Sequence, residues 1–81
     1  MGKRIMIEKV RDSKEAGLDD PRKLWDYLRQ TLKDTNESMS FDSFSRAEIP
    51  AVLELQRRGF VGICRLKIKI EEKKRDKEYE T

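Results

Sequence analysis

Histidine is absent from this chain of 81 residues, and cysteine occurs once, at Cys64. A single cysteine cannot form a disulfide within one monomer, and without histidine no zinc site of the Cys/His type can be assembled from one chain. We therefore expect neither a metal site nor a cofactor. Side-chain amides are also rare, whereas charged residues make up 43% of the chain. This balance resembles the Lys/Glu-rich usage of heat-adapted proteins.

Long apolar runs are missing as well. No stretch approaches the ~18 apolar residues that span a bilayer, and residues 1–10 contain no apolar segment long enough for a signal peptide. Together with the single cysteine, these absences predict a cytoplasmic protein without membrane contact. The small size and the lack of motifs are also typical of a viral protein.

The motifs of common enzyme classes are absent too. The chain contains no Gly-rich phosphate loop, no Gly-x-Ser-x-Gly turn and no Cys-x-x-Cys pair. The adjacent carboxylates Asp19–Asp20 and Glu71–Glu72 lie near expected element boundaries, where capping and solvation explain them. Cys64 is in phase with Leu66 and Ile68 along the sequence, which predicts a buried, inert thiol. We therefore expect a protein that is not an enzyme.

The first half of the chain predicts a strand and a helix. Residues 3–10 are rich in β-branched side chains, but their apolar residues fall on both faces, so this strand should be covered on both sides or lie in a dimer. Asp20 is suited to cap a helix that starts at Pro21. Leu24, Leu28 and Leu32 then repeat along one face, and Trp25 widens that face. We expect this helix to run to about Thr35 and to end at Asn36.

The second half predicts a loop, a helix and a strand. Residues 37–45 form a serine-rich loop whose three apolar side chains either plug a thin core or contact a partner; they are Met39, Phe41 and Phe44. Ser45 and Glu48 match a capping box, yet Pro50 conflicts with a helix that starts so early, so either the first turn is distorted or the regular helix starts nearer Pro50. Gly59 is suited to end that helix. From Cys64 to Ile70 the apolar and basic residues alternate, which predicts one half-buried strand beside the N-terminal strand.

These elements predict an α+β fold of β-α-α-β order, with two helices on a two-stranded sheet that dimerisation would complete. We expect a single domain over residues 1–70, followed by a charged C-terminal tail over residues 71–81. A chain this short buries a thin core, so a homodimer is an expected form of reinforcement.

The charge pattern points to one function. Between Arg57 and Lys69 the chain has five basic residues and no acidic one: Arg57, Arg58, Arg65, Lys67 and Lys69. Basic side chains two residues apart on one strand stand roughly 7 Å apart and can each meet a phosphate. The sequence therefore predicts a small nucleic-acid-binding protein, such as a transcriptional regulator, that docks through this basic strand face. Helix-end arginines and edge-strand lysines also occur for structural reasons alone.

The stretch "LELQRRGFVGI", which leads directly into a basic strand, resembles the passage from recognition helix to wing in winged helix-turn-helix domains. The resemblance covers roughly residues 22–70. It implies that Arg46, Glu54, Arg57 and Arg58 lie on or near the helix that enters the major groove. Arg65, Lys67 and Lys69 would lie in the wing, which contacts the nucleic-acid backbone. In this family the wing is a hairpin, and a short helix lies between the first helix and the recognition helix. Here "ICRLKIKIEEKK" contains no turn dipeptide, and "SMSFDSFS" is a poor match to the short helix.

A second class of function stays open. The chain would then be a non-enzymatic protein-binding module, inhibitor or subunit that acts through an edge strand and the apolar loop at 37–45. Geometry distinguishes the two classes. If the five basic residues share one face away from the acidic residues of the first helix, nucleic acid is favoured; if they are scattered or paired with Glu71 and Glu72, a protein partner is favoured.

Overall fold

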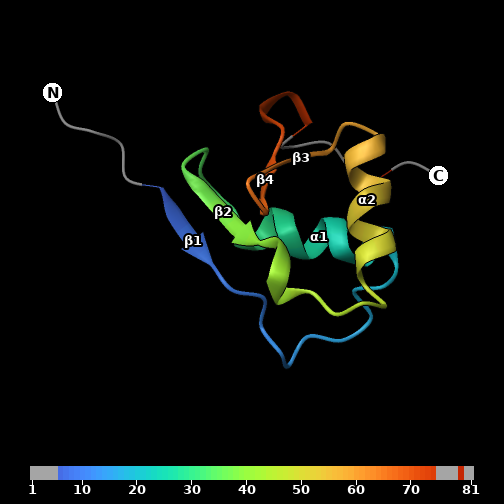
Figure 1. Cartoon of the computed structure of the whole chain (residues 1–81). Coiled ribbons are helices and arrows are strands. Elements are labelled where there is room, and N and C mark those ends of the chain that lie inside the picture. Colours follow the sequence, from blue (N-terminus) through green and yellow to red (C-terminus); the bar gives the residue numbers. More distant parts are fainter. Residues whose placement is uncertain (1–5, 75–78, 80–81) are drawn as a thin grey trace, which may run out of the picture.

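The computed structural model describes residues 6–74 and Tyr79 (Figure 1). Two α-helices and four strands form this part of the chain. Their bounds, with those of two short 3-10 helices, are β1 Ile7–Lys9, α1 Pro21–Thr31, β2 Glu37–Ser40, η1 Phe41–Ser43, α2 Ile49–Arg57, β3 Val61–Cys64, β4 Lys67–Ile70 and η2 Glu72–Lys74. The predicted α+β class is confirmed, and so is the presence of two helices.

The sheet is larger than the two strands that we predicted. Within the described residues it has four strands in the order β1-β2-β4-β3. β1 runs parallel to β2, while β4 is antiparallel to both β2 and β3. The N-terminal strand therefore pairs with β2 and lies at an edge, instead of beside the last strand as expected. Residues 3–5 of the predicted strand lie outside the described residues.

Helix α1 follows its local signals at the start but not at the end. Asp20 accepts a hydrogen bond from the Arg22 N–H at 3.1 Å, and Pro21 takes the first helical position. Leu24, Trp25 and Leu28 are all buried along one face. The helix ends at Thr31 with Leu32 as its C-cap, so the expected extension to Thr35 is wrong. The chain leaves the helix early because residues from Glu37 onward enter the sheet.

The expected loop at residues 37–45 is instead strand β2 followed by η1. Met39 is fully buried at the centre of the sheet, where it lies opposite Ile68. Phe44 is also in the core, and Phe41 packs against it. Serine disfavours strands, but two neighbouring strands hold β2, and this tertiary context outweighs its composition. The side chains of Met39 and Phe44 plug the core and offer no open surface to a partner.

Helix α2 resolves the conflict between Ser45 and Pro50. The regular helix starts at Ile49, so Pro50 lies in its first turn, where no intrahelical N–H bond is lost. Glu48 still reaches back and accepts a hydrogen bond from the Ser45 N–H at 2.9 Å. At the other end Gly59 has φ +83°, and the Phe60 N–H donates to the Leu55 carbonyl at 2.9 Å. This is the predicted Schellman ending.

The prediction of a single strand over Cys64–Ile70 is wrong, because the chain reverses in the middle of it. β3 and β4 form a hairpin whose two turn residues, Arg65 and Leu66, have φ of 54° and 63°. A positive φ at two successive residues is characteristic of a type I′ turn. The two central residues of such a turn are most often Asn-Gly. Cys64 therefore lies opposite Lys67 and is exposed, not buried as expected.

The two faces of the sheet differ in what covers them. Met39, Ile68 and Ile70 point into the core that both helices share. The intervening residues of β4, Lys67 and Lys69, point to the opposite face because side chains alternate along a strand. Tyr79 in the C-terminal tail stacks on Phe60, with ring centroids 5.5 Å apart. No helix in the described residues is long and apolar enough to cross a membrane.

The hairpin turn gives a first test of this fold. Replacing Arg65 with Asn and Leu66 with Gly keeps the backbone path and relieves two left-handed conformations. We expect the double variant to be more stable by about 1 kcal/mol, measured by urea unfolding. Leu66→Ala retains the strained backbone, so that control should show no such gain. Unchanged or lower stability of the double variant would contradict the I′ turn.

Candidate functional site

The five basic residues predicted to bind nucleic acid lie in three separate places. Arg57 and Arg58 are at the C-terminal end of α2. Arg65 is in the turn at the far end of the β3–β4 hairpin. Lys67 and Lys69 project from β4 on the face turned away from the helices. The fold therefore divides the stretch that looked continuous in the sequence.

One carboxylate contacts both helix arginines, and an aromatic ring contacts one of them. The guanidinium groups of Arg57 and Arg58 both donate hydrogen bonds to the carboxylate of Glu54. These bonds, first that of Arg58 and then that of Arg57, lower the pKa of Glu54 below its ordinary value. The Arg58 guanidinium also lies 5.1 Å from the centre of the Tyr79 ring. An approaching phosphate would therefore meet a carboxylate between the two arginines.

The strand lysines lie on a face with mixed charges. The Lys67 Nζ is 3.9 Å from an oxygen of Glu8 on β1. The pairing of β2 with β4 sets Ser40 opposite Lys67, and the same register sets Ser38 opposite Lys69. Glu8 and Ser38 are themselves opposite each other across β1 and β2. One row across the outer face of the sheet is therefore Glu8, Ser38 and Lys69.

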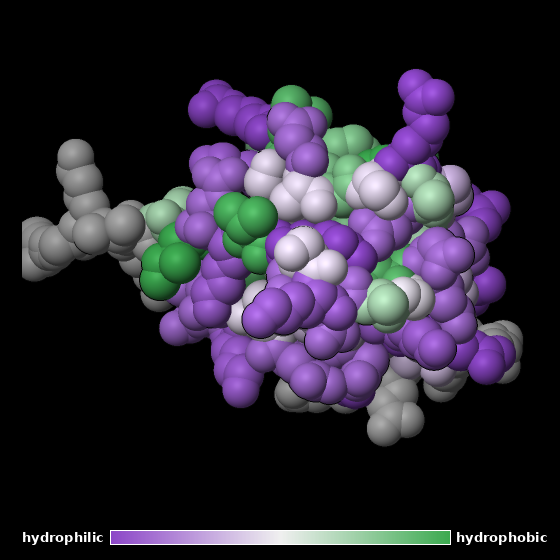
Figure 2. Space-filling model, turned by 90° about the horizontal axis from the view of Figure 1, so that it is seen from below, coloured by the Kyte–Doolittle hydropathy of each residue, from purple (hydrophilic) through white to green (hydrophobic). Residues whose placement is uncertain are grey.

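Strand β1 forms an exposed edge with apolar side chains. Ile7 in β1 is 43% exposed, and the flanking residues Met6 and Val10 are 44% and 71% exposed. The other large apolar side chains this open among the described residues are Leu53 on α2 and Leu66 in the hairpin turn, which stand singly. Figure 2 shows apolar side chains at the end of the molecule that adjoins the grey N-terminal residues. In Figure 1, β1 lies on the side of β2 that is away from both helices. We name the continuous segment from Met6 to Val10, with Glu8 at its centre, the β1 edge.

The backbone of β1 faces two ways. The Ile7 N–H donates to the Asn36 carbonyl at 2.8 Å, so Ile7 turns its polar groups toward β2. Because backbone groups alternate along a strand, the N–H and C=O of Glu8 point away from β2, toward the open side. These are the groups through which an added strand would pair with the sheet.

Both charged side chains of β1 turn back onto the sheet. Glu8 pairs with Lys67 of β4, and the Lys9 Nζ is 3.6 Å from a Glu37 oxygen of β2. Exposed edge strands commonly carry charges that discourage another strand from adding. Here those charges are partly neutralised within the chain, which leaves the apolar side chains as the dominant feature of the edge.

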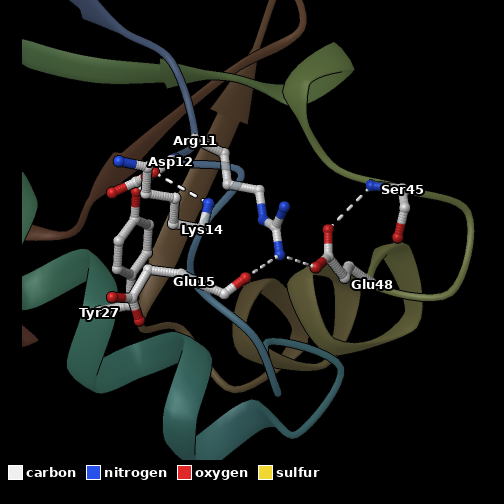
Figure 3. A network of polar contacts seen from close by, with 7 residues as sticks. All are labelled: Arg11, Asp12, Lys14, Glu15, Tyr27, Ser45 and Glu48. Atoms are coloured by element: carbon white, nitrogen blue, oxygen red, sulfur yellow. Dashed lines mark hydrogen bonds and ion pairs between the residues drawn. The ribbon is translucent and has the colours of Figure 1, made fainter.

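A polar network fixes the chain where it leaves β1 (Figure 3). Arg11 forms an ion pair with the buried carboxylate of Glu48 and donates to the Glu15 carbonyl at 2.7 Å. Next to it, the Asp12 N–H donates to the Tyr27 hydroxyl at 2.8 Å. These contacts tie β1 to α1 and α2. A strand of only three residues is thereby held in a defined position at the edge of the sheet.

Other features of the described residues give weaker indications of chemistry. No group of three or more His, Cys, Asp or Glu side chains among them could hold a metal ion. A hollow of about 490 Å³ lies between residues 15–18 and α1, and its lining includes Arg22, Lys23 and Asp26. Charges of both signs therefore line it.

The sequence carried a signal for the β1 edge, namely apolar residues on both faces of the first strand. It carried none for the ion pairs of Glu8 and Lys9, which join residues far apart in the chain.

Comparisons of the chain with protein-family models, with curated proteins and with solved structures found no match.

Proposed function

We propose that the chain is a small, non-enzymatic protein-binding module whose β1 edge pairs with a strand of another polypeptide. The observation that carries this proposal is the exposure of Ile7 on an edge strand, and of Met6 and Val10 on either side of it, while the two charges of the strand are paired within the chain. An added strand would satisfy the outward backbone groups of Glu8 and cover these side chains. The division of the basic residues, each helix arginine being held by Glu54, also favours a protein partner over nucleic acid.

A matched pair of variants tests this function. Glu8→Pro removes the outward N–H of β1, whereas the inward bond of Ile7 to β2 remains. Glu8→Ala removes the same carboxylate but keeps the N–H. We expect capture of partner proteins from lysate of the native cells to be lost with Glu8→Pro and retained with Glu8→Ala. Equal capture by both variants, with both folded by circular dichroism, would contradict pairing at this edge.

Nucleic-acid binding is the second candidate, and one observation favours it. The hairpin β3–β4 follows α2 directly, and the turn η1 lies between α1 and α2. The winged helix-turn-helix family has a hairpin wing and a short intervening helix at these places. In such a complex the exposed Arg46 and Arg65 would accompany the arginines at the end of α2.

A titration distinguishes this second candidate. Fluorescence anisotropy of labelled duplex DNA and single-stranded RNA at two salt concentrations should show binding that falls steeply with salt. Replacing Arg65, Lys67 and Lys69 with Gln should then weaken binding and flatten its dependence on salt, with little loss of folding. Absence of binding even at low salt would leave the protein-binding module as the only candidate of the two.

A further inference from the structure

We propose that the β1 edge is occupied by a second copy of the chain, paired antiparallel about a two-fold axis at Ile7. This inference rests on the proposed function of the β1 edge and names its partner. A two-fold axis perpendicular to the sheet joins the two sheets into one and keeps the helices of both copies on the same face. Each copy contributes the same residues, as in other isologous interfaces.

Hydrogen bonding limits the registers to a few. The outward backbone groups belong to Glu8 and, by alternation, to Met6 and Val10. These residues must therefore face one another across the two strands. Within β1 itself the two-fold axis can lie at Ile7, at Glu8 or at Lys9.

Charge selects among these three registers. An axis at Glu8 sets two glutamates directly opposite, and an axis at Lys9 sets two lysines opposite; both arrangements are destabilising. An axis at Ile7 sets Ile7 against its own copy and Met6 against Glu8 of the second copy. In this register, no two described residues of like charge stand directly opposite each other across the two copies. The half-exposed Ile7 becomes covered by an identical apolar side chain.

Self-pairing also matches the energetics of so small a fold. A single core of this size supplies limited stability, and small domains are often reinforced by oligomerisation. The ion pairs of Glu8 with Lys67 and of Lys9 with Glu37 offset the edge charges in part, and they use none of the backbone groups through which the second copy pairs. The Arg11 network holds both strands in position before they meet.

Cysteine cross-linking tests the register directly. All variants carry Cys64→Ser, since Cys64 is exposed and would itself cross-link. With the axis at Ile7, the two copies of this residue form a non-hydrogen-bonded pair with Cα atoms about 4.5 Å apart, which a disulfide can bridge. We expect Ile7→Cys to form a covalent dimer under mild oxidation, and Glu8→Cys and Lys9→Cys to remain largely monomeric. Preferential cross-linking through either of the latter two would overturn this register.

Sedimentation of the full chain tests the association itself. The unmodified chain should sediment as a dimer at high concentration, and Ile7→Lys should raise the dissociation constant by about tenfold or more. A chain that stays monomeric and does not cross-link at any of the three positions would overturn the second copy as partner. The capture experiment then separates the two failures. If Glu8→Pro still abolishes capture and Glu8→Ala does not, the edge binds another protein; if both capture equally, the edge proposal fails too.

Discussion

Replacing Arg11 with Met should destabilise the fold by about 3 kcal/mol. The Arg11 side chain is only 15% exposed and that of its partner Glu48 only 9%. Methionine keeps most of the aliphatic stem of Arg11 but leaves the Glu48 carboxylate buried without its cation. The carboxylate retains the Ser45 N–H as a donor, so the loss should lie at the lower end of the range for broken buried pairs.

A double variant separates this effect from lost packing. Arg11→Met with Glu48→Gln removes both charges, and the Gln carbonyl can still accept from the Ser45 N–H. We expect the double variant to be clearly more stable in urea unfolding than Arg11→Met alone. Additive losses would mean that the two side chains do not act as a pair. The single variant should also speed amide exchange at Ile7, because Arg11 holds the end of β1.

The elements that could be predicted are those whose signals are local. Asp20 and Pro21 define the start of α1 within two residues, and Gly59 defines the end of α2 through a positive φ that glycine adopts without strain. Such signals act through hydrogen bonds between near neighbours in the chain. The helices were therefore foreseeable from the sequence, apart from the early end of α1.

The hairpin could not be foreseen because its turn is atypical and hides the reversal. A two-residue turn leaves the alternation of apolar and basic residues unbroken in the sequence, so Cys64 and Ile68 appear in phase. Across the turn, however, Cys64 faces Lys67, which places it on the outer face. Arg65 and Leu66 adopt left-handed conformations without the Gly or Asn that usually marks them. The hydrogen bond from the Phe41 N–H to the Leu66 carbonyl, at 2.7 Å, helps to fix the turn from outside the hairpin.

The candidate site was only half predictable for a related reason. The apolar residues on both faces of the first strand predicted that it is covered on both sides or lies in a dimer, and the structure leaves Ile7 of this strand 43% exposed at the sheet edge. The pairing of this strand with β2 could not be predicted. β2 has few strand-forming residues, and a parallel pair of strands depends on a crossover connection, here through α1. The five basic residues lie within one short stretch of the sequence, but the end of a helix, a turn and one face of a strand send them in different directions.

Replacing Leu28 with Ala should cost about 3 kcal/mol of folding stability. Leu28 lies on the inner face of α1 and is fully buried in the core shared by both helices and the sheet. Alanine removes three carbons and leaves a cavity, which neighbours in so small a core can fill only in part. Arg22→Ala on the exposed face of the same helix is the matched control, and it should change stability by less than about 0.5 kcal/mol.

Urea unfolding of both variants, followed by Trp25 fluorescence, measures this difference. Trp25 is buried and lies against Phe60, with ring centroids 4.7 Å apart, so its emission reports the integrity of the same core. Equal midpoints for the two variants would mean that α1 turns another face to the sheet. Since α1 is also the crossover between β1 and β2, that result would require a different packing of this crossover on the sheet.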